Sequence, residues 1–160
     1  MFYDQLETRV GRILIAADDR ALRFVLLPDH GRSARPEPGW ERRVTPLIQR
    51  ARRQLEAYFA GRRYEFDLPL EPDGTPFQRS VWRALERVPF GATVSYGELA
   101  RRVRKPKASR AVGAACGRNP LPIVIPCHRV IGKDGGLVGF GGGLAMKTAL
   151  LKLEEERARG

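Results

Sequence analysis

A turn-forming segment near the middle of the chain divides it into two halves with different patterns. Residues 71–76 read Glu-Pro-Asp-Gly-Thr-Pro, a run that favours turns and interrupts regular structure. Before it, most apolar residues form short β-type runs, whereas after it they recur mainly at helical spacing. A chain of 160 residues can form one domain or two small packed domains. We therefore predict two domains, residues 1–73 and 74–160.

The first half has the pattern of a small sheet with one helix. Residues 10–16 and 22–27 are apolar runs separated by a polar turn, which predicts a strand pair. Residues 45–59 repeat apolar side chains at helical spacing, and Thr45 is placed to cap that helix. Residues 64–68 alternate in polarity, which predicts a further strand.

The second half is predicted to be mainly helical. Residues 77–88 place apolar side chains on one helix face, with Thr75 as the expected cap. Two shorter helices, residues 96–103 and 108–118, flank a tight turn, which suggests a helix-turn-helix, and a last helix covers residues 144–156. The fold class is therefore mixed α/β, of the α+β kind: a sheet-and-helix domain followed by a mainly helical domain.

The net charge of +11 lies almost wholly in the second half. Residues 1–76 carry 13 Lys and Arg against 12 Asp and Glu, whereas residues 77–160 carry 16 against 6. Because cationic side chains release the counterions condensed on nucleic acid, the second half is a candidate nucleic-acid-binding domain. The alternative is an arginine-rich solvated surface without such a partner.

Cysteine usage and hydropathy bear on cofactors and location. Two Cys and two His are too few for a disulfide framework, and a four-ligand zinc site would need all of them. We expect no metal and no other cofactor. No stretch approaches about 18 apolar residues, and the first residues lack the pattern of a leader. We expect a monomeric cytoplasmic protein with reduced thiols and no membrane association.

Cys127 and His128 form the candidate chemical centre. They follow a Pro-rich apolar run, residues 119–126, that would hold the thiol rigidly. A thiol attacks well as its thiolate, which a neighbouring base or positive charge favours, and His128 and Arg129 supply both. Neighbours on an extended segment point to opposite faces, so sulfur and imidazole meet only if the chain turns here. The alternative is an inert buried cysteine.

Two further segments bear on this centre. The helix predicted at residues 108–118 carries Arg110 among Ala, Gly and Ser, so it could approach a narrow minor groove and place Arg110 where a base has left the stack. The alternative is a closely packed core helix.

The glycine-dense residues 132–143 lack the ending of a P-loop and suit close backbone approach to a flat ligand. Glu154 could orient His128 in a Cys/His/Glu relay.

Several motifs of the second half occur together in the O6-alkylguanine-DNA alkyltransferases. They are Val-Ser-Tyr at 94–96, Arg-Ala-Val-Gly at 110–113, Asn-Pro at 119–120, Pro-Cys-His-Arg-Val-Ile at 126–131 and Gly-Gly-Leu-Ala-x-Lys at 142–147. The chain resembles this family continuously from residue 76 to about residue 154, and more loosely before that. The resemblance implies a ribonuclease H-like first domain and a partner, double-stranded DNA containing O6-alkylguanine.

The resemblance also implies a reaction. Cys127 would accept a methyl or larger alkyl group from O6 of a guanine, or from O4 of a thymine, flipped out of the duplex. The transfer would be irreversible, with one turnover per molecule. His128 would deprotonate Cys127 through a water, Glu154 would orient His128, and Tyr96 would donate a proton toward the leaving base.

Further residues take roles by the same resemblance. Tyr96 would also contact a DNA phosphate, and Arg110 would fill the vacated place in the base stack. The other expected positions are Ala111, Gly113 and Ala114 on the DNA-binding helix, the hinge residue Asn119, and Val130, Phe140 and Lys147 around the pocket. Phe140 stands where many relatives carry Tyr, which removes one hydroxyl. Some relatives have an N-terminal zinc site, but the first half here has no Cys and only His30.

Two other functions use the same residues. A thiol hydrolase built on Cys127, His128 and Glu154 would need an oxyanion hole and would turn over repeatedly. A lesion sensor would bind alkylated DNA without accepting the group, but such relatives lack the acceptor cysteine that this chain has.

Overall fold

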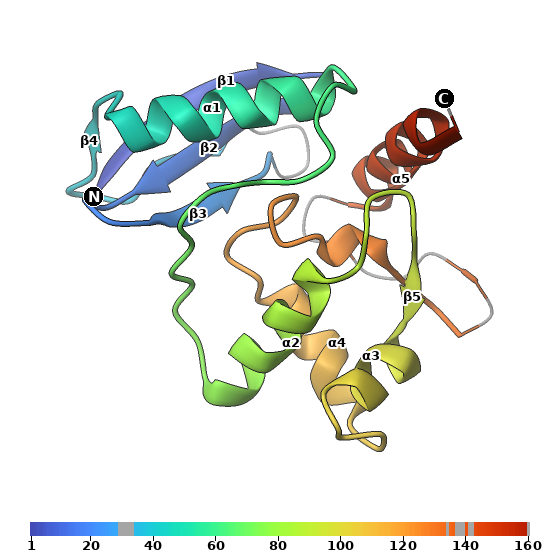
Figure 1. The fold of residues 1–160 in the computed structure, drawn as a ribbon. Helices are drawn as coiled ribbons and strands as arrows, with labels where there is room; N and C mark the ends of the chain where they lie inside the picture. The colour runs from blue at the N-terminus through green and yellow to red at the C-terminus, as the bar shows by residue number, and fades with distance from the viewer. Residues whose placement is uncertain (29–33, 134, 137–139, 141–142, 160) are drawn as a thin grey trace.

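The computed structural model describes residues 1–28, 34–133, 135–136, 140 and 143–159. The first half forms a four-stranded sheet with helix α1 (Pro46–Phe59) lying across it (Figure 1). The strands are β1 (Phe2–Thr8), β2 (Gly11–Ala17), β3 (Leu22–Leu26) and β4 (Glu41–Arg42), in the order β3-β2-β1-β4. The first three pair antiparallel, and β4 pairs parallel with β1. The predicted strand pair and helix are therefore confirmed.

Helix α1 forms where its pattern and its cap predict. The Thr45 side chain accepts from the Ile48 backbone N–H, and Pro46 occupies the first turn, where a missing N–H costs nothing. The buried face consists of Ile48, Ala51, Gln54, Leu55, Tyr58 and Phe59. This face covers β1 and β2, and Tyr58 lies in the last turn of the helix.

The strand predicted at residues 64–68 is wrong. These residues follow α1 without joining a sheet, and only Leu70, further along, makes an isolated bridge with Leu22. Instead of a neighbouring strand, the Gln54 side chain bonds the backbone of Asp67, donating to its carbonyl and accepting from its N–H, both at 2.9 Å. A helix side chain thus takes the place of the strand that the alternating pattern predicted.

The second half is mainly helical, as predicted. It contains α2 (Pro76–Glu86), α3 (Tyr96–Arg102), α4 (Ser109–Gly117) and α5 (Leu144–Arg159), with the short parallel pair β5 (Val94–Ser95) and β6 (Val130–Ile131). Thr75 and Gln78 form a capping box at the start of α2. Two short helices joined by a turn, α3 and α4, pack on each other and on α2, whose Trp82 indole donates to the Ala115 carbonyl at 2.9 Å. The mixed α/β class is confirmed.

Among the residues described, no helix is both long enough and apolar enough to cross a membrane.

The edge of the sheet is joined to both the linker and the loop that leads to Cys127. On β3, the Leu22 N–H donates to the Pro69 carbonyl at 2.8 Å and the Val25 N–H donates to the Pro120 carbonyl at 2.9 Å. Apolar side chains of both halves form one continuous core. The first half therefore fixes the start of the loop that carries the candidate thiol.

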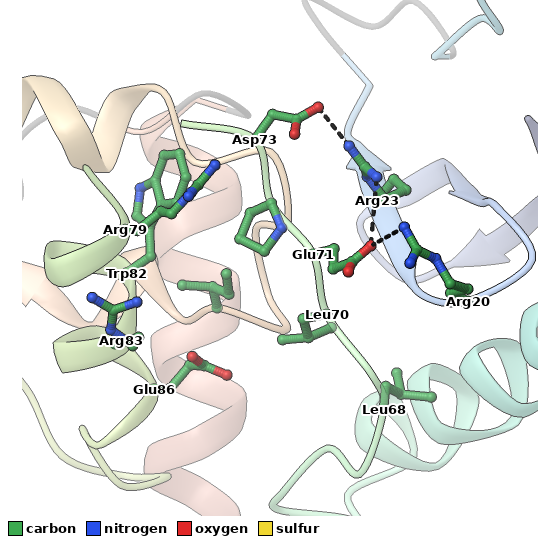
Figure 2. Close-up of a pocket in the computed structure, with 12 residues that line it drawn as sticks. Arg20, Arg23, Leu68, Leu70, Glu71, Asp73, Arg79, Trp82, Arg83 and Glu86 are labelled. Carbon is green, nitrogen blue, oxygen red and sulfur yellow. Dashed lines mark hydrogen bonds and ion pairs between the residues drawn. The ribbon is translucent and has the colours of Figure 1, made fainter. Parts of the chain in front are cut away.

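A cavity of about 670 Å³ lies at this junction (Figure 2). Arg20 and Arg23 of the sheet domain line one side and pair with Glu71 and Asp73 of the linker. Residues of α2 line the other side, namely Arg79, Trp82, Arg83 and Glu86. Cys127 does not line this cavity, so it is separate from the candidate chemical centre.

Candidate active site

The backbone turns at Cys127 and His128. Such a turn is the condition for the thiol and the imidazole to meet. Cys127–Arg129 form one turn of 3-10 helix, in which the Arg129 N–H donates to the Pro126 carbonyl at 3.0 Å and the Val130 N–H donates to the Cys127 carbonyl. Cys127 is 9% exposed and His128 is fully buried. The turn thus removes the extended geometry that would have sent the two side chains to opposite faces.

Asn119 holds the loop that leads into this turn. Its side-chain NH2 donates to the Ile125 carbonyl at 2.8 Å, and its side-chain oxygen accepts from the Leu121 N–H at 2.9 Å. Ile123, between these anchors, is buried with φ of +75°, a conformation that a β-branched residue adopts only under constraint. The loop is therefore a fixed support for Cys127, and Asn119 remains the expected hinge.

Glu154 of α5 forms the centre of a buried polar network. Its Oε2 lies 2.6 Å from His128 Nε2, and its two oxygens accept a bidentate pair of bonds from Arg129 at 2.7 and 3.1 Å. Arg129 also donates to the Val88 carbonyl at 2.7 Å. Burial alone would raise the pKa of Glu154, but the hydrogen bonds from His128 and Arg129, together with the positive charge of Arg129, outweigh it and lower that pKa to about 2. The carboxylate is therefore ionised at neutral pH.

The ionised carboxylate decides which nitrogen of His128 carries the proton. A carboxylate can only accept, so Nε2 carries the hydrogen that bonds Glu154. The other ring nitrogen, Nδ1, then has a free lone pair, and within the part of the chain that the structure describes it makes no hydrogen bond. Burial lowers the pKa of His128 below its ordinary value, although Glu154 opposes this shift. His128 is thus a neutral base at pH 7.

The Cys127 thiol is also neutral at rest. Burial raises its pKa, an effect that a hydrogen bond from Asn119 and the positive charge of Lys147 only partly offset. Lys147 is itself fully buried and donates to the Val130 carbonyl at 2.6 Å. A neutral thiol and a neutral imidazole favour proton transfer during the reaction over a preformed ion pair.

The second cysteine lacks these features. Cys116 lies on the buried side of α4, and burial, together with the nearby Cys127, raises its pKa to about 12. Like Cys127 it is protonated at neutral pH, but it lies on α4, outside the turn that carries His128.

Helix α4 has one side packed in the core and one side exposed. Val112, Ala115 and Cys116 are buried against the core, whereas Arg110, Ala111 and Ala114 are exposed. The exposed side is a smooth surface with one long cationic side chain. Around the turn between α3 and α4, further exposed cations add to it, namely Arg101, Arg102, Arg104, Lys105 and Lys107.

Tyr96 connects this surface to the centre. It begins α3 and is partly buried, and a Cβ added to Gly113 would lie 3.7 Å from its ring, an ordinary contact. Burial raises the pKa of Tyr96, and the nearby cysteines add to that shift, so the hydroxyl stays protonated and able to donate.

The remaining expected positions are only partly described. Val130 is buried in β6 and Phe140 is partly buried against the core. Gly139, Gly141 and Gly142 of the glycine-dense loop lie outside the described residues, as does His30.

Two residues of the network lie outside the Cys/His/Glu relay that the sequence predicts. The sequence places Arg129 only as a charge beside the thiol, whereas its bidentate pairing with Glu154 depends on the packing of α5 against the turn. Tyr58 comes from α1 in the first half, and its hydroxyl donates to Glu154 Oε2 at 2.5 Å. An aromatic residue on the buried face of an amphipathic helix is ordinarily core, so only the fold reveals this contact.

The fold and the site define a cysteine-dependent protein with a smooth, basic helical surface beside its thiol. Two family models match the chain: the 6-O-methylguanine DNA methyltransferase DNA binding domain over residues 76–156 and the ribonuclease-like domain of the same proteins over residues 1–72. The chain belongs to the 6-O-methylguanine DNA methyltransferase family.

Individual relatives are similar over nearly the whole chain. The methylated-DNA–protein-cysteine methyltransferase of Methanosarcina acetivorans is 47% identical over 96% of this chain and 98% of its own length. The constitutive enzyme of that name from Bacillus subtilis is 46% identical over 96% of this chain and 94% of its own. The Mycobacterium tuberculosis OGT solved in complex with DNA superposes with a TM-score of 0.90, at 41% identity, over 98% of this chain and 94% of that one.

Proposed function

We propose that this chain repairs DNA directly, by moving the alkyl group of O6-alkylguanine in a duplex onto the sulfur of Cys127. It is a methylated-DNA–protein-cysteine methyltransferase, as its family membership and its near-full-length relatives support. The observation that carries the choice of acceptor is that one 3-10 turn holds a nearly buried thiol next to a neutral imidazole, whose Nε2 bonds the buried Glu154 carboxylate.

The residues support a balanced sequence of proton and alkyl transfer. Nδ1 of His128 takes the proton of Cys127 through a bridging water, and the imidazolium that forms is stabilised by Glu154. The sulfur attacks the alkyl carbon, the bond from that carbon to O6 breaks, and the leaving guanine takes a proton from the Tyr96 hydroxyl. The proton held on His128 then returns through solvent to the Tyr96 phenolate, so the thiol proton of Cys127 is in effect transferred to guanine. The product is a thioether, which water does not readily cleave, so each molecule reacts once.

Mass spectrometry tests this function. Incubation of the protein with duplex DNA containing one O6-methylguanine is expected to add one methyl group to the peptide that contains Cys127 and to return an unmodified guanine. The same duplex with plain guanine is the control and should add nothing. An intact lesion together with an unmodified Cys127 would contradict the proposal, and repeated turnover without mass gain would favour a hydrolase.

We further propose that the exposed side of α4 enters the minor groove and that Arg110 fills the stack behind a flipped base. Arg110, Ala111 and Ala114 are exposed on this side. The exposed cations around the α3–α4 turn would contact phosphates. Gly113 lies beside the Tyr96 ring.

Arg110→Ala tests the flipping role. Because unstacking a base costs a few kcal/mol that an inserted side chain offsets, repair of duplex DNA should slow by roughly 10- to 100-fold. Reaction with free O6-benzylguanine, which needs no flipping, should keep its wild-type rate. Arg101→Ala, which removes an exposed cation on α3, is the matched control: it should weaken duplex binding but, with the duplex at saturating concentration, keep the wild-type rate on both substrates. Equal losses on duplex and free base for Arg110→Ala would argue against the role.

Three finer expectations belong to the same proposal. O4-alkylthymine presents a similar oxygen-bound alkyl group and is a second substrate. Both cysteines of the described chain are free thiols, which fits action in the reducing cytoplasm, where chromosomal DNA is also found in a bacterium or archaeon. The protein acts as a monomer, with Asn119 as hinge and Val130, Phe140 and Lys147 around the guanine pocket.

A further inference from the structure

The first half of the chain supplies a side chain to the catalytic network. Tyr58 is fully buried near the end of α1, 96 residues before Glu154 in the sequence, and its hydroxyl donates to Glu154 Oε2 at 2.5 Å. The same oxygen lies 2.6 Å from His128 Nε2. One carboxylate oxygen thus joins a residue of the sheet domain to the base beside Cys127.

The Tyr58 hydroxyl can act only as a donor in this contact. Burial raises the pKa of Tyr58 well above its ordinary value, and the negative charge of Glu154 adds to that shift, so the phenol stays protonated. Its ring packs against Phe59, Phe66 and Phe90, with centroids 5.3 to 6.0 Å away, which fixes the direction of the hydroxyl. The position of the donor is therefore fixed by α1 and by these aromatic rings, none of which belongs to α5.

We propose that Tyr58 is a positioning residue for alkyl transfer: its hydroxyl fixes the Glu154 carboxylate and limits the charge that this carboxylate presents to His128. The inference rests on the proposed roles of Cys127 and His128. With this role, the first half of the chain would take part in the reaction, in addition to anchoring the loop before Cys127 through the bond from Val25 to Pro120.

The charges around His128 determine the sign of the effect. Glu154 raises the pKa of His128, whereas the positive charges of Arg129 and Lys147 lower it, with burial as the largest effect in the same direction. Removing the Tyr58 hydroxyl leaves Glu154 with one donor fewer, so the carboxylate attracts the Nε2 hydrogen more strongly. The pKa of His128 then rises, and the base is lost to protonation at a higher pH than in the wild type.

The test uses Tyr58→Phe in the full-length protein, with single-turnover rates of transfer from O6-methylguanine duplex measured from pH 5 to 9. We expect the rate plateau to fall roughly tenfold, since a bond to a charged group is lost, and the acid limb of the profile to move to higher pH. Affinity for the lesion duplex should not change.

Tyr64→Phe is the matched control. The Tyr64 hydroxyl also joins the first half to α5, donating to the Arg157 carbonyl at 3.0 Å, and its ring stacks on Phe90. It does not bond Glu154, so this variant should keep the wild-type profile. Wild-type transfer in the same experiment tests the proposed function separately from the role of Tyr58.

A second substitution reverses the expected shift. Replacing Tyr58 by 3,5-difluorotyrosine keeps the ring and makes the phenol a stronger donor, so the acid limb should move to lower pH. If Tyr58 acted only through packing, the substitutions would change the melting temperature but not the pH at which the acid limb of the rate profile falls. Unchanged limbs in both the Phe and the fluorinated variants, or shifts of the same sign, would overturn the proposal.

Discussion

Cys127→Ser is expected to abolish alkyl transfer while leaving the protein folded and able to bind lesion DNA. A serine hydroxyl is far less acidic than a thiol and a poorer nucleophile toward an sp3 carbon, and this site supplies only a neutral imidazole as base. The hydroxyl is smaller than the thiol, so the turn can hold it without a clash and should keep its shape. Transfer should slow by at least about a thousandfold, on the order of 4 kcal/mol in the barrier.

Cys116→Ser is the matched control for this experiment. Both thiols are buried in the second half and burial raises the pKa of both, but Cys116 lies on α4 whereas Cys127 lies in the turn that carries His128. Intact mass after incubation with O6-methylguanine duplex should show one methyl group on Cys116→Ser and none on Cys127→Ser. Gel-shift affinity for the duplex should be similar for both. A methyl group on Cys127→Ser, or its loss in Cys116→Ser with the fold intact, would place the acceptor elsewhere.

The helices were predictable from sequence because their local signals are complete. Thr45 and Thr75 cap α1 and α2 as expected, and each helix repeats its apolar residues at helical spacing. Strand β1 was missed because its centre holds Asp4, a residue type rarely buried. Asp4 is 2% exposed only because Arg52, 48 residues later, pairs with it at 2.6 Å. A charge that depends on a distant partner leaves no local signal.

The site was predictable only in part for a similar reason. Cys127 and His128 adjoin in sequence, so their chemistry could be inferred at once. Glu154 stands among three successive acids, and nothing local distinguishes it, yet it is buried while Glu155 and Glu156 are exposed. Tyr58 and Arg129 join the network through contacts between helix α1, the 3-10 turn and helix α5, which the sequence pattern does not specify.

Glu154→Gln is expected to damage both stability and transfer. The change keeps size and shape but removes the charge that balances Arg129, which is 5% exposed and bonded to both carboxylate oxygens. Breaking a buried pair by neutralising one partner costs about 3 kcal/mol or more, so the melting temperature should fall by roughly 10 °C. Glu155→Gln is the matched control, because it breaks only the exposed ion pair with Arg159. It should lower the melting temperature by no more than a few degrees.

The loss of transfer is separable from the loss of stability. In Glu154→Gln the new amide NH2 can donate to His128 Nε2, which would place the ring proton on Nδ1 and remove the base that faces the reaction. We expect transfer to slow roughly 100-fold or more at temperatures where the variant remains folded. Adding Arg129→Met removes the unpaired buried cation and should recover part of the melting temperature without recovering the rate. Recovery of both together would mean that Glu154 acts only through folding.

The pH dependence of stability gives an independent check on the charge of Glu154. Its folded pKa of about 2 lies below its ordinary value of 4.5, so the ionised carboxylate contributes stability that is fully present above pH 4.5 and is lost as the pH falls toward 2. Glu154→Gln has no such group to protonate. The difference in free energy of unfolding between the wild type and Glu154→Gln, measured by urea titration, should therefore be largest near neutral pH and should shrink steadily below pH 4.5. A difference that stays constant down to pH 3 would mean that the ionised charge of Glu154, and with it the fixed tautomer of His128, is not what holds this network together.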